Sequence, residues 1–125
     1  MTESGNPVSS ALFDASIELR GNTSIVHASG EVDIASAPAL AARIDQALAK
    51  NPRKLIVDLS QVTMLDSSGL GVLIQVLKEL ENGDANTALR LVVGERHVLK
   101  VFSITGLDGV FSIFSSLEEA THASS

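Results

Sequence analysis

The spacing of apolar residues along this chain changes several times, and each spacing predicts a different kind of element. Two strand-like stretches, SIELR (16–20) and TSIVHASG (23–30), flank the pair Gly21-Asn22. Glycine and asparagine favour the tight two-residue turn of a β-hairpin. The chain is therefore predicted to open with an antiparallel pair of strands.

A helical pattern follows this hairpin. Its apolar stripe is formed by residues four positions apart, Leu40, Ile44 and Leu48. Ser36 is a candidate N-cap, and Pro38 is tolerated in the first turn of a helix. Asn51-Pro52 ends the pattern, since proline cannot continue a helix. The spacing thus predicts one amphipathic helix between Ser36 and Asn51.

The next two elements have the clearest patterns of the chain. Lys54–Ser60 carries consecutive apolar residues, which is typical of a strand covered on both faces, so we expect it at the centre of a sheet. From Ser67 the spacing is helical until Asn82-Gly83. The apolar positions of this second helix are Leu70, Val72, Leu73, Ile74, Val76 and Leu77. They predict a largely buried helix.

The rest of the chain completes one α/β domain. The remaining predicted elements are a strand at Leu89–Val93, a short helix at His97–Ser103, a short strand at Val110–Phe114 and a last helical turn at Leu117–Thr121. We expect a mixed sheet of four to five strands with helices packed against it, spanning residues 12–121. The polar ends, 1–11 and 122–125, are predicted to be flexible tails.

Composition narrows the possible functions. The chain has 125 residues, of which 45% are apolar, and its formal net charge is -6. Acidic proteins do not neutralise phosphates, so a nucleic-acid partner is not expected, and a basic or mixed protein surface suits this chain better. Cysteine is absent, and no apolar run approaches the length of a membrane helix. We expect a soluble, cytoplasmic protein without a signal peptide, a membrane partner, a metal or a cofactor.

The stretch MLDSSGLGVL (64–73) is the strongest candidate for a functional site. It places hydroxyls and backbone amides where a loop enters the second helix, and such a helix start suits an anion or a phosphate. The alternative is an ordinary helix cap. Gly69 and Gly71 lie in the first helical turns, where each glycine costs about 0.5 to 1 kcal/mol relative to alanine. Both would leave bare backbone for another molecule to approach.

Known catalytic motifs fit the chain poorly. Neither Ser67 nor Ser68 is preceded by the glycine of a hydrolase nucleophile elbow. A Walker-type loop is absent, and GLGVLI lacks the third glycine of a dinucleotide-binding loop. Asp58 could suggest a phosphate-accepting aspartate, but the acidic pair of a receiver domain is missing. The three histidines, His27, His97 and His122, are expected to have structural or solvent-exposed roles.

Three segments together resemble the STAS domain, the family of bacterial anti-sigma factor antagonists. They are GEVDIASAP (30–38), LIVDLSQVTMLDSSGLGVL (55–73) and VFSITGLDGVFSIF (101–114), and the resemblance covers residues 12–121. It implies a switch protein in a bacterial stress response and not an enzyme. Such antagonists bind an anti-sigma factor that is also a serine kinase, which frees the sigma factor for RNA polymerase.

The resemblance also implies the roles of particular residues. The kinase would phosphorylate Ser67, or alternatively Ser68, and thereby release the antagonist, while a metal-dependent serine phosphatase would reverse this step. The partner-binding surface implied by the family motif consists of Asp33, Ser36, Asp66, Ser68, Gly69, Leu70 and Gly71. Asp33 has the alternative role of a loop carboxylate that caps a helix.

Two other functions stay open at this point. A STAS domain could serve as a subunit of a signalling scaffold or a transporter-associated assembly without any sigma factor. A nucleotide-binding or nucleotide-hydrolysing enzyme is the third possibility. Neighbouring genes that encode a sigma factor or a small kinase would best distinguish the first two functions.

Overall fold

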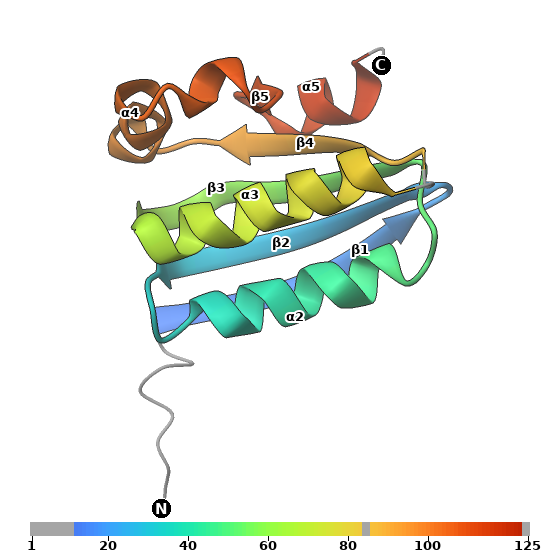
Figure 1. Cartoon of the computed structure of the whole chain (residues 1–125), viewed down its shortest axis with the longest axis horizontal. Coiled ribbons are helices and arrows are strands. Elements are labelled where there is room, and N and C mark those ends of the chain that lie inside the picture. Colours follow the sequence, from blue (N-terminus) through green and yellow to red (C-terminus); the bar gives the residue numbers. More distant parts are fainter. Residues whose placement is uncertain (1–11, 84–85, 124–125) are drawn as a thin grey trace, which may run out of the picture.

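The computed structural model describes residues 12–83 and 86–123. The predicted tail 1–11 and residues 124–125 lie outside these ranges. The elements, in chain order, are β1 (Phe13–Arg20), β2 (Thr23–Val32), α2 (Ala37–Leu48), β3 (Lys54–Leu65), α3 (Ser67–Asn82), β4 (Ala88–Val93), α4 (Arg96–Ile104), a short 3-10 helix (Leu107–Gly109), β5 (Ile113–Phe114) and α5 (Leu117–His122) (Figure 1).

The strands form one mixed five-stranded sheet whose spatial order follows the chain order. β1 is antiparallel to β2, and their two-residue loop begins at Gly21, which has φ +57°. The remaining neighbours are parallel, each pair joined by a segment that contains a helix. The predicted hairpin, the central position of β3 and the α/β fold class are thus confirmed.

Helices α2 and α3 lie side by side on one face of the sheet (Figure 1). The main core lies between this helical layer and the sheet. Its fully buried side chains include Leu40 and Ile44 of α2, Leu73 of α3 and Val57 of β3. α3 buries only one face, so the expectation of a largely buried helix was too strong. Its opposite face stays available to a partner.

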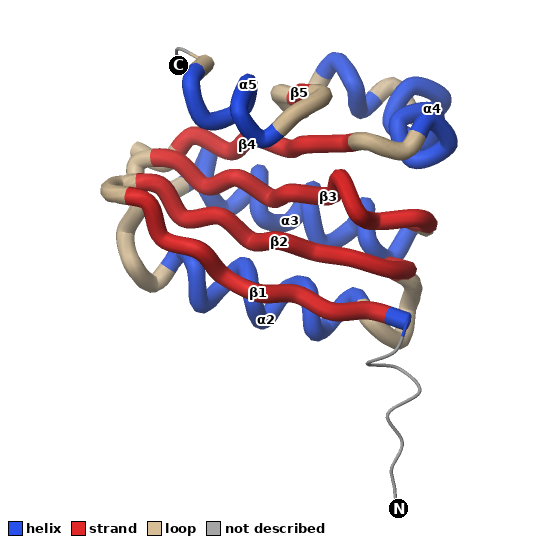
Figure 2. The backbone as a smooth tube through the Cα atoms, turned by 180° about the vertical axis from the view of Figure 1, so that it is seen from behind, coloured by secondary structure: helices blue, strands red, loops and turns tan. Residues whose placement is uncertain are grey.

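The other face of the sheet carries a smaller apolar cluster. Ile25, Ile56 and Val92 pack there against Ala120 of α5. In the reverse view the sheet lies nearer to the reader, and α2 and α3 lie behind it (Figure 2). Among the described residues, no helix is long and apolar enough to span a bilayer.

Two strands differ in length from their predictions. β3 continues past Ser60 to Leu65, because β2 stays paired with it up to Val32↔Leu65, across a shift in register between Gly30 and Glu31. β5 is shorter than 110–114 and contains only Ile113 and Phe114. The preceding 3-10 helix leaves Val110 exposed, so this residue does not enter the sheet.

Candidate functional site

Two loops meet at the edge of the sheet where the parallel strands β2 and β3 end. Val32 and Leu65 are paired across these strands, and the backbone N–H of Asp66 donates to the carbonyl oxygen of Val32 at 3.1 Å. α2 and α3 both begin at this edge (Figure 1). We call residues 33–36 and 66–71 the strand-end surface. It contains every site residue predicted from the sequence, so the fold brings the two motifs together.

Asp66 caps α3. Its Oδ1 accepts hydrogen bonds from the backbone N–H groups of Ser68, at 2.9 Å, and Gly69, at 3.3 Å. The alternative of a helix cap is therefore confirmed for Asp66, whose carboxylate already uses two of the amides at this helix start. An anion added here meets a capped helix start and a negative charge.

The two candidate serines lie in different surroundings. Ser67 is the first residue of α3 and is exposed, whereas Ser68 is half-buried. Within residues 12–83 and 86–123, the Ser67 hydroxyl has no hydrogen-bond partner, and the capping role belongs to Asp66. The local structure thus leaves the Ser67 hydroxyl free to react or bind.

The two glycines of the motif, Gly69 and Gly71, lie in different surroundings. A Cβ at Gly69 would lie 2.4 Å from Cδ1 of Leu65 and 2.7 Å from Cγ1 of Val32. A Cβ at Gly71 would meet nothing within 4 Å. Only Gly71, which lies four residues after Ser67 on the same face of the helix, offers open backbone. Gly69 and Leu70 are buried.

Asp33 organises the loop before α2. Its Oδ1 accepts from the N–H groups of Ala35, at 2.9 Å, and Ser36, at 3.0 Å. The backbone amide of Ser36, together with its hydroxyl and the amide of Ala35, lowers the pKa of Asp33. Asp33 therefore closes the loop before α2, and neither amide that its side chain binds belongs to the helix.

Ser36 is buried, and its hydroxyl binds backbone groups outside α2. Its hydroxyl accepts from the N–H of Asp33 at 2.9 Å and donates to the carbonyl oxygen of Glu31 at 2.7 Å. It makes no side-chain cap on α2, although it precedes the helix. Ser36 is thus the N-cap residue of α2, as predicted, but its hydroxyl does not cap the helix because it is used inside the loop.

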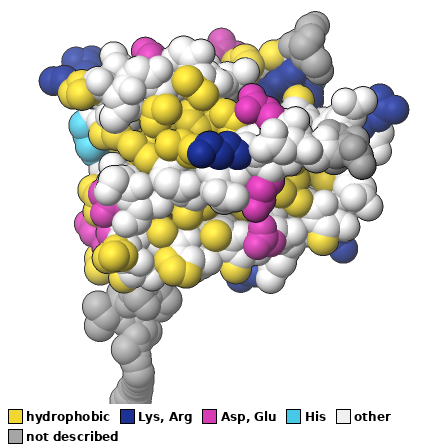
Figure 3. All heavy atoms as spheres, viewed as in Figure 1, with side chains coloured by type: hydrophobic (Ala, Val, Ile, Leu, Met, Phe, Trp, Pro, Cys, Tyr) yellow, Lys and Arg dark blue, Asp and Glu magenta, His cyan; other side chains and the backbone are white. Residues whose placement is uncertain are grey.

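The apolar pattern of the sequence did not point to Ile34, which lies in the same loop. Its side chain is 80% exposed, although an apolar residue beside Val32 suggests a continuation of the strand. The only sequence signal was its place between two polar residues of the turn, Asp33 and Ser36. In the space-filling view, acidic and apolar side chains lie together at the edge where α2 and α3 begin (Figure 3).

A groove runs from the strand-end surface between α2 and α3. It has a volume of about 410 Å³ and is lined by Ser68, Gly71, Val72, Gln75, Val76 and Glu79 of α3 and by Ala41 and Asp45 of α2. Apolar surface is visible between the two helices, with acidic side chains beside it (Figure 3). The groove is continuous with the open backbone at Gly71.

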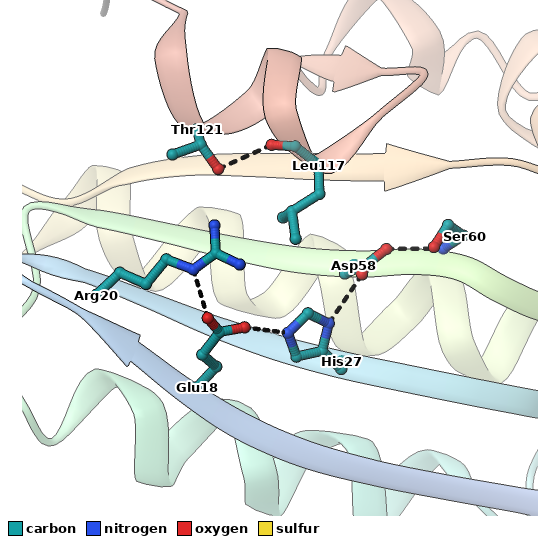
Figure 4. Close-up of polar contacts among 7 residues, drawn as sticks. All are labelled: Glu18, Arg20, His27, Asp58, Ser60, Leu117 and Thr121. Atoms are coloured by element: carbon teal, nitrogen blue, oxygen red, sulfur yellow. Dashed lines mark hydrogen bonds and ion pairs between the residues drawn. The ribbon is translucent and has the colours of Figure 1, made fainter.

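A separate polar cluster lies on the sheet face opposite α2 and α3. Nδ1 of His27 is 2.8 Å from Oδ2 of Asp58, and Nε2 is 2.7 Å from Oε1 of Glu18 (Figure 4). Arg20 is also hydrogen-bonded to Glu18. A ring flanked by two carboxylates binds both of them only as the imidazolium, which donates from each nitrogen.

This arrangement changes two pKa values. Burial disfavours the charge on His27, but the hydrogen bonds to Glu18 and Asp58 outweigh it and raise the pKa of His27. Arg20 and then His27 lower the pKa of Glu18. Asp58 is also engaged by the N–H of Ser60, at 3.0 Å, so it is a structural residue here and no exposed phosphate acceptor.

The other two histidines are peripheral. His97 contacts the carbonyl oxygen of Thr63, and His122 is the last residue of α5. In the part of the chain that the structure describes, no three metal-ligating side chains come together.

Comparison with known proteins identifies the family. The model of the STAS domain matches residues 14–120. The anti-sigma-F factor antagonist RsfB of Mycobacterium tuberculosis is 32% identical over 91 residues, which are 73% of this chain and 72% of RsfB. The sequence resemblance to this family is thus confirmed.

Solved structures agree in fold. An anti-sigma factor antagonist from Mycobacterium paratuberculosis has a TM-score of 0.79 at 31% identity, covering 87% of this chain and 91% of that one. The anti-sigma factor antagonist SpoIIAA, solved in its unphosphorylated form, has a TM-score of 0.67 at 25% identity, covering 86% of this chain and 93% of its own. These relatives are named as antagonists and not as enzymes, in agreement with the prediction that this chain is not an enzyme. The chain therefore belongs to the STAS domain family and, within it, to the bacterial anti-sigma factor antagonists.

Proposed function

We propose that this protein binds an anti-sigma factor with serine-kinase activity, releases the sigma factor, and is switched off by phosphorylation of Ser67. The observation that carries the proposal is the division of roles between Asp66 and Ser67. Asp66 caps α3, so the exposed Ser67 hydroxyl has no structural duty to lose when it is modified. Gly71 on the same helix face leaves room for a partner.

The electrostatics support release after phosphorylation. A phosphate adds about -1.5 to -2 charge units and three acceptor oxygens. Asp66 lies next to Ser67 and already occupies two amides of the helix start. The added charge therefore finds little compensation within the protein and is directed at the partner. A misplaced charge in a close interface costs several kcal/mol, and each 1.4 kcal/mol is about tenfold in affinity.

The proposal includes the partners and the cellular setting. The kinase transfers the γ-phosphoryl group of ATP to Ser67, and a serine phosphatase restores the hydroxyl. Because the released sigma factor acts on RNA polymerase, the switch operates in the cytoplasm. Its output is a stress response. The remaining site residues, Asp33, Ser36, Ser68, Gly69 and Leu70, contribute mainly by fixing the shape of the strand-end surface, since three of them are buried.

A phosphorylation experiment with matched variants tests this function. The protein is incubated with ATP and, in turn, each of the organism's anti-sigma factors of the histidine-kinase-like ATPase fold, and the phosphate is located by mass spectrometry. We expect one phosphate on the wild type and on Ser68→Ala, and none on Ser67→Ala. Without a kinase, no ATP should be consumed.

Two outcomes would contradict the proposal. A phosphate retained by Ser67→Ala would move the site to another residue. Binding without phosphorylation by any of these kinases would favour the scaffold or transporter-associated function instead.

A further inference from the structure

Ile34 is an apolar side chain that the structure holds out into solvent. It is 80% exposed, more than any other large apolar residue of the described chain. An isolated exposed apolar residue is ordinary on a protein surface. The loop that carries Ile34 is not ordinary, because it is fixed on both sides of this residue.

The hydrogen bonds that fix this loop come from its own residues and from Glu31 at the end of β2. Oδ1 of Asp33 accepts from Ala35 and Ser36, and the hydroxyl of Ser36 links the N–H of Asp33 with the carbonyl oxygen of Glu31. None of these bonds involves the Ile34 side chain. A rigid loop that presents an apolar group loses little conformational freedom when that group is buried by a partner.

The position of Ile34 connects it with Ser67. Val32 and Leu65 are paired across β2 and β3, and the N–H of Asp66 is bonded to the carbonyl oxygen of Val32. Ile34 and Ser67 each follow this pair by two residues, on the two loops that leave the same edge of the sheet. Both side chains are exposed there.

The charges around Ile34 indicate the chemistry of its partner. Glu31, Asp33 and Asp66 are the acidic residues of the two strand ends, and the whole chain has a net charge of -6. An apolar pocket with a basic rim complements an apolar side chain with acidic neighbours. Interfaces commonly contain such a central anchor surrounded by polar contacts.

We propose that Ile34 is the apolar anchor by which this protein docks on its anti-sigma factor, inserting into a basic-rimmed apolar pocket next to the kinase active site. This inference rests on the proposed function and adds a division of labour to it. Ile34 supplies affinity, and Ser67 supplies the switch.

The test compares two isoleucines of similar exposure. Ile104, at the end of α4, is 75% exposed and lies outside the strand-end surface, so Ile104→Ala is the matched control. Affinity is measured by titration calorimetry against the anti-sigma factor that binds the wild type. We expect Ile34→Ala to weaken binding by about tenfold or more, and Ile34→Leu to retain most of the affinity. Ile104→Ala should bind like the wild type.

Phosphorylation kinetics give a second readout. An anchor contributes equally to the bound substrate and to the transition state, so Ile34→Ala should raise KM for the protein substrate with little change in kcat. All variants should unfold at the wild-type temperature, because both isoleucines are exposed.

Each result has a defined meaning. Unchanged affinity of Ile34→Ala, or an equal loss in Ile104→Ala, would overturn the anchor while leaving the proposed function intact. A lower kcat with unchanged KM would also overturn it, because Ile34 would then act on the chemical step. Failure of the wild type to bind any anti-sigma factor of this fold would overturn both proposals.

Discussion

At the scale of single residues, the two glycines of the DSSG-L-G motif show how one sequence feature can have two physical causes. Gly69 faces inward, and a methyl group there would collide with Leu65 and Val32. Gly71 faces outward into open space. The hypothesis that both glycines serve the approach of a partner therefore does not hold for Gly69, which allows α3 to pack closely on the ends of β2 and β3.

Alanine substitutions at these glycines should have opposite effects on stability. Gly71→Ala removes the helix cost of glycine and should leave the free energy of unfolding unchanged or raise it by up to about 1 kcal/mol. Gly69→Ala overpacks the core and should lower it by about 1 to 3 kcal/mol. Urea denaturation of the two variants measures both values.

The same two variants distinguish a role in internal packing from a role in partner binding. Gly71→Ala should bind the anti-sigma factor more weakly than the wild type, because its methyl group protrudes from the helix face that carries Ser67. A badly destabilised Gly71→Ala would show that this glycine is needed for internal packing after all.

At the scale of elements, His27 joins three strands on the sheet face that α2 and α3 do not cover. It belongs to β2, and its ring binds Glu18 of β1 and Asp58 of β3 (Figure 4). β1 is an edge strand of the sheet. The protonated ring therefore links this edge strand to the centre of the sheet.

The pKa shifts of this cluster set the direction of its pH dependence. The pKa of His27 is raised above its ordinary value of 6.5, so its contribution is complete below 6.5 and is lost as pH rises through the raised pKa. The pKa of Glu18 is lowered from 4.5, so its contribution is complete above 4.5 and is lost as pH falls through the lowered pKa. The contributions of both groups are complete between pH 4.5 and pH 6.5, so the cluster is most stabilising there.

Replacing His27 should remove the loss of stability that the cluster causes as the pH rises. On going from about pH 6 to about pH 9, the wild type should lose free energy of unfolding, and His27→Gln should lose less. The difference between the two proteins should thus shrink as pH rises. His122→Gln, which changes a histidine at the end of α5, is the control and should follow the wild type. A difference that grows with pH would mean that the ring binds its partners in the neutral form.

At the scale of the whole molecule, the proposed switch changes the surface and not the fold. Ser67 is exposed, its hydroxyl is unused by the capped helix, and the core beneath it is formed by other residues. A negative group at the start of a helix is favourable, whereas the neighbouring Asp66 carboxylate opposes it. These two effects act in opposite directions, so we expect little net change in stability.

Substitutions at Ser67 should therefore alter binding without altering folding. Ser67→Ala should keep its affinity for the anti-sigma factor and should resist release in the presence of ATP. Ser67→Asp should bind at least about tenfold more weakly, because it carries charge into the contact surface. Circular dichroism should show the same thermal unfolding for both variants and the wild type, and titration calorimetry measures the affinities. Equal affinity of all three proteins would exclude Ser67 as the switch.

The sequence alone determined the features that depend on near neighbours in the chain. Apolar spacing predicted the β1–β2 hairpin, the central strand and the bounds of α3, because the period of a helix or strand is a local property. Local turn chemistry predicted the loop at Gly21 and the end of α3 at Gly83. The DSSG motif identified the segment that forms the candidate site.

Only the tertiary structure decided what each residue of that segment does. Gly69 is required by Val32, a residue far from it in the chain. The length of β3 and the ion pairs of His27 likewise depend on partners brought together by the sheet. Strand register selects those partners, and local spacing contains no information about which distant residue will lie opposite.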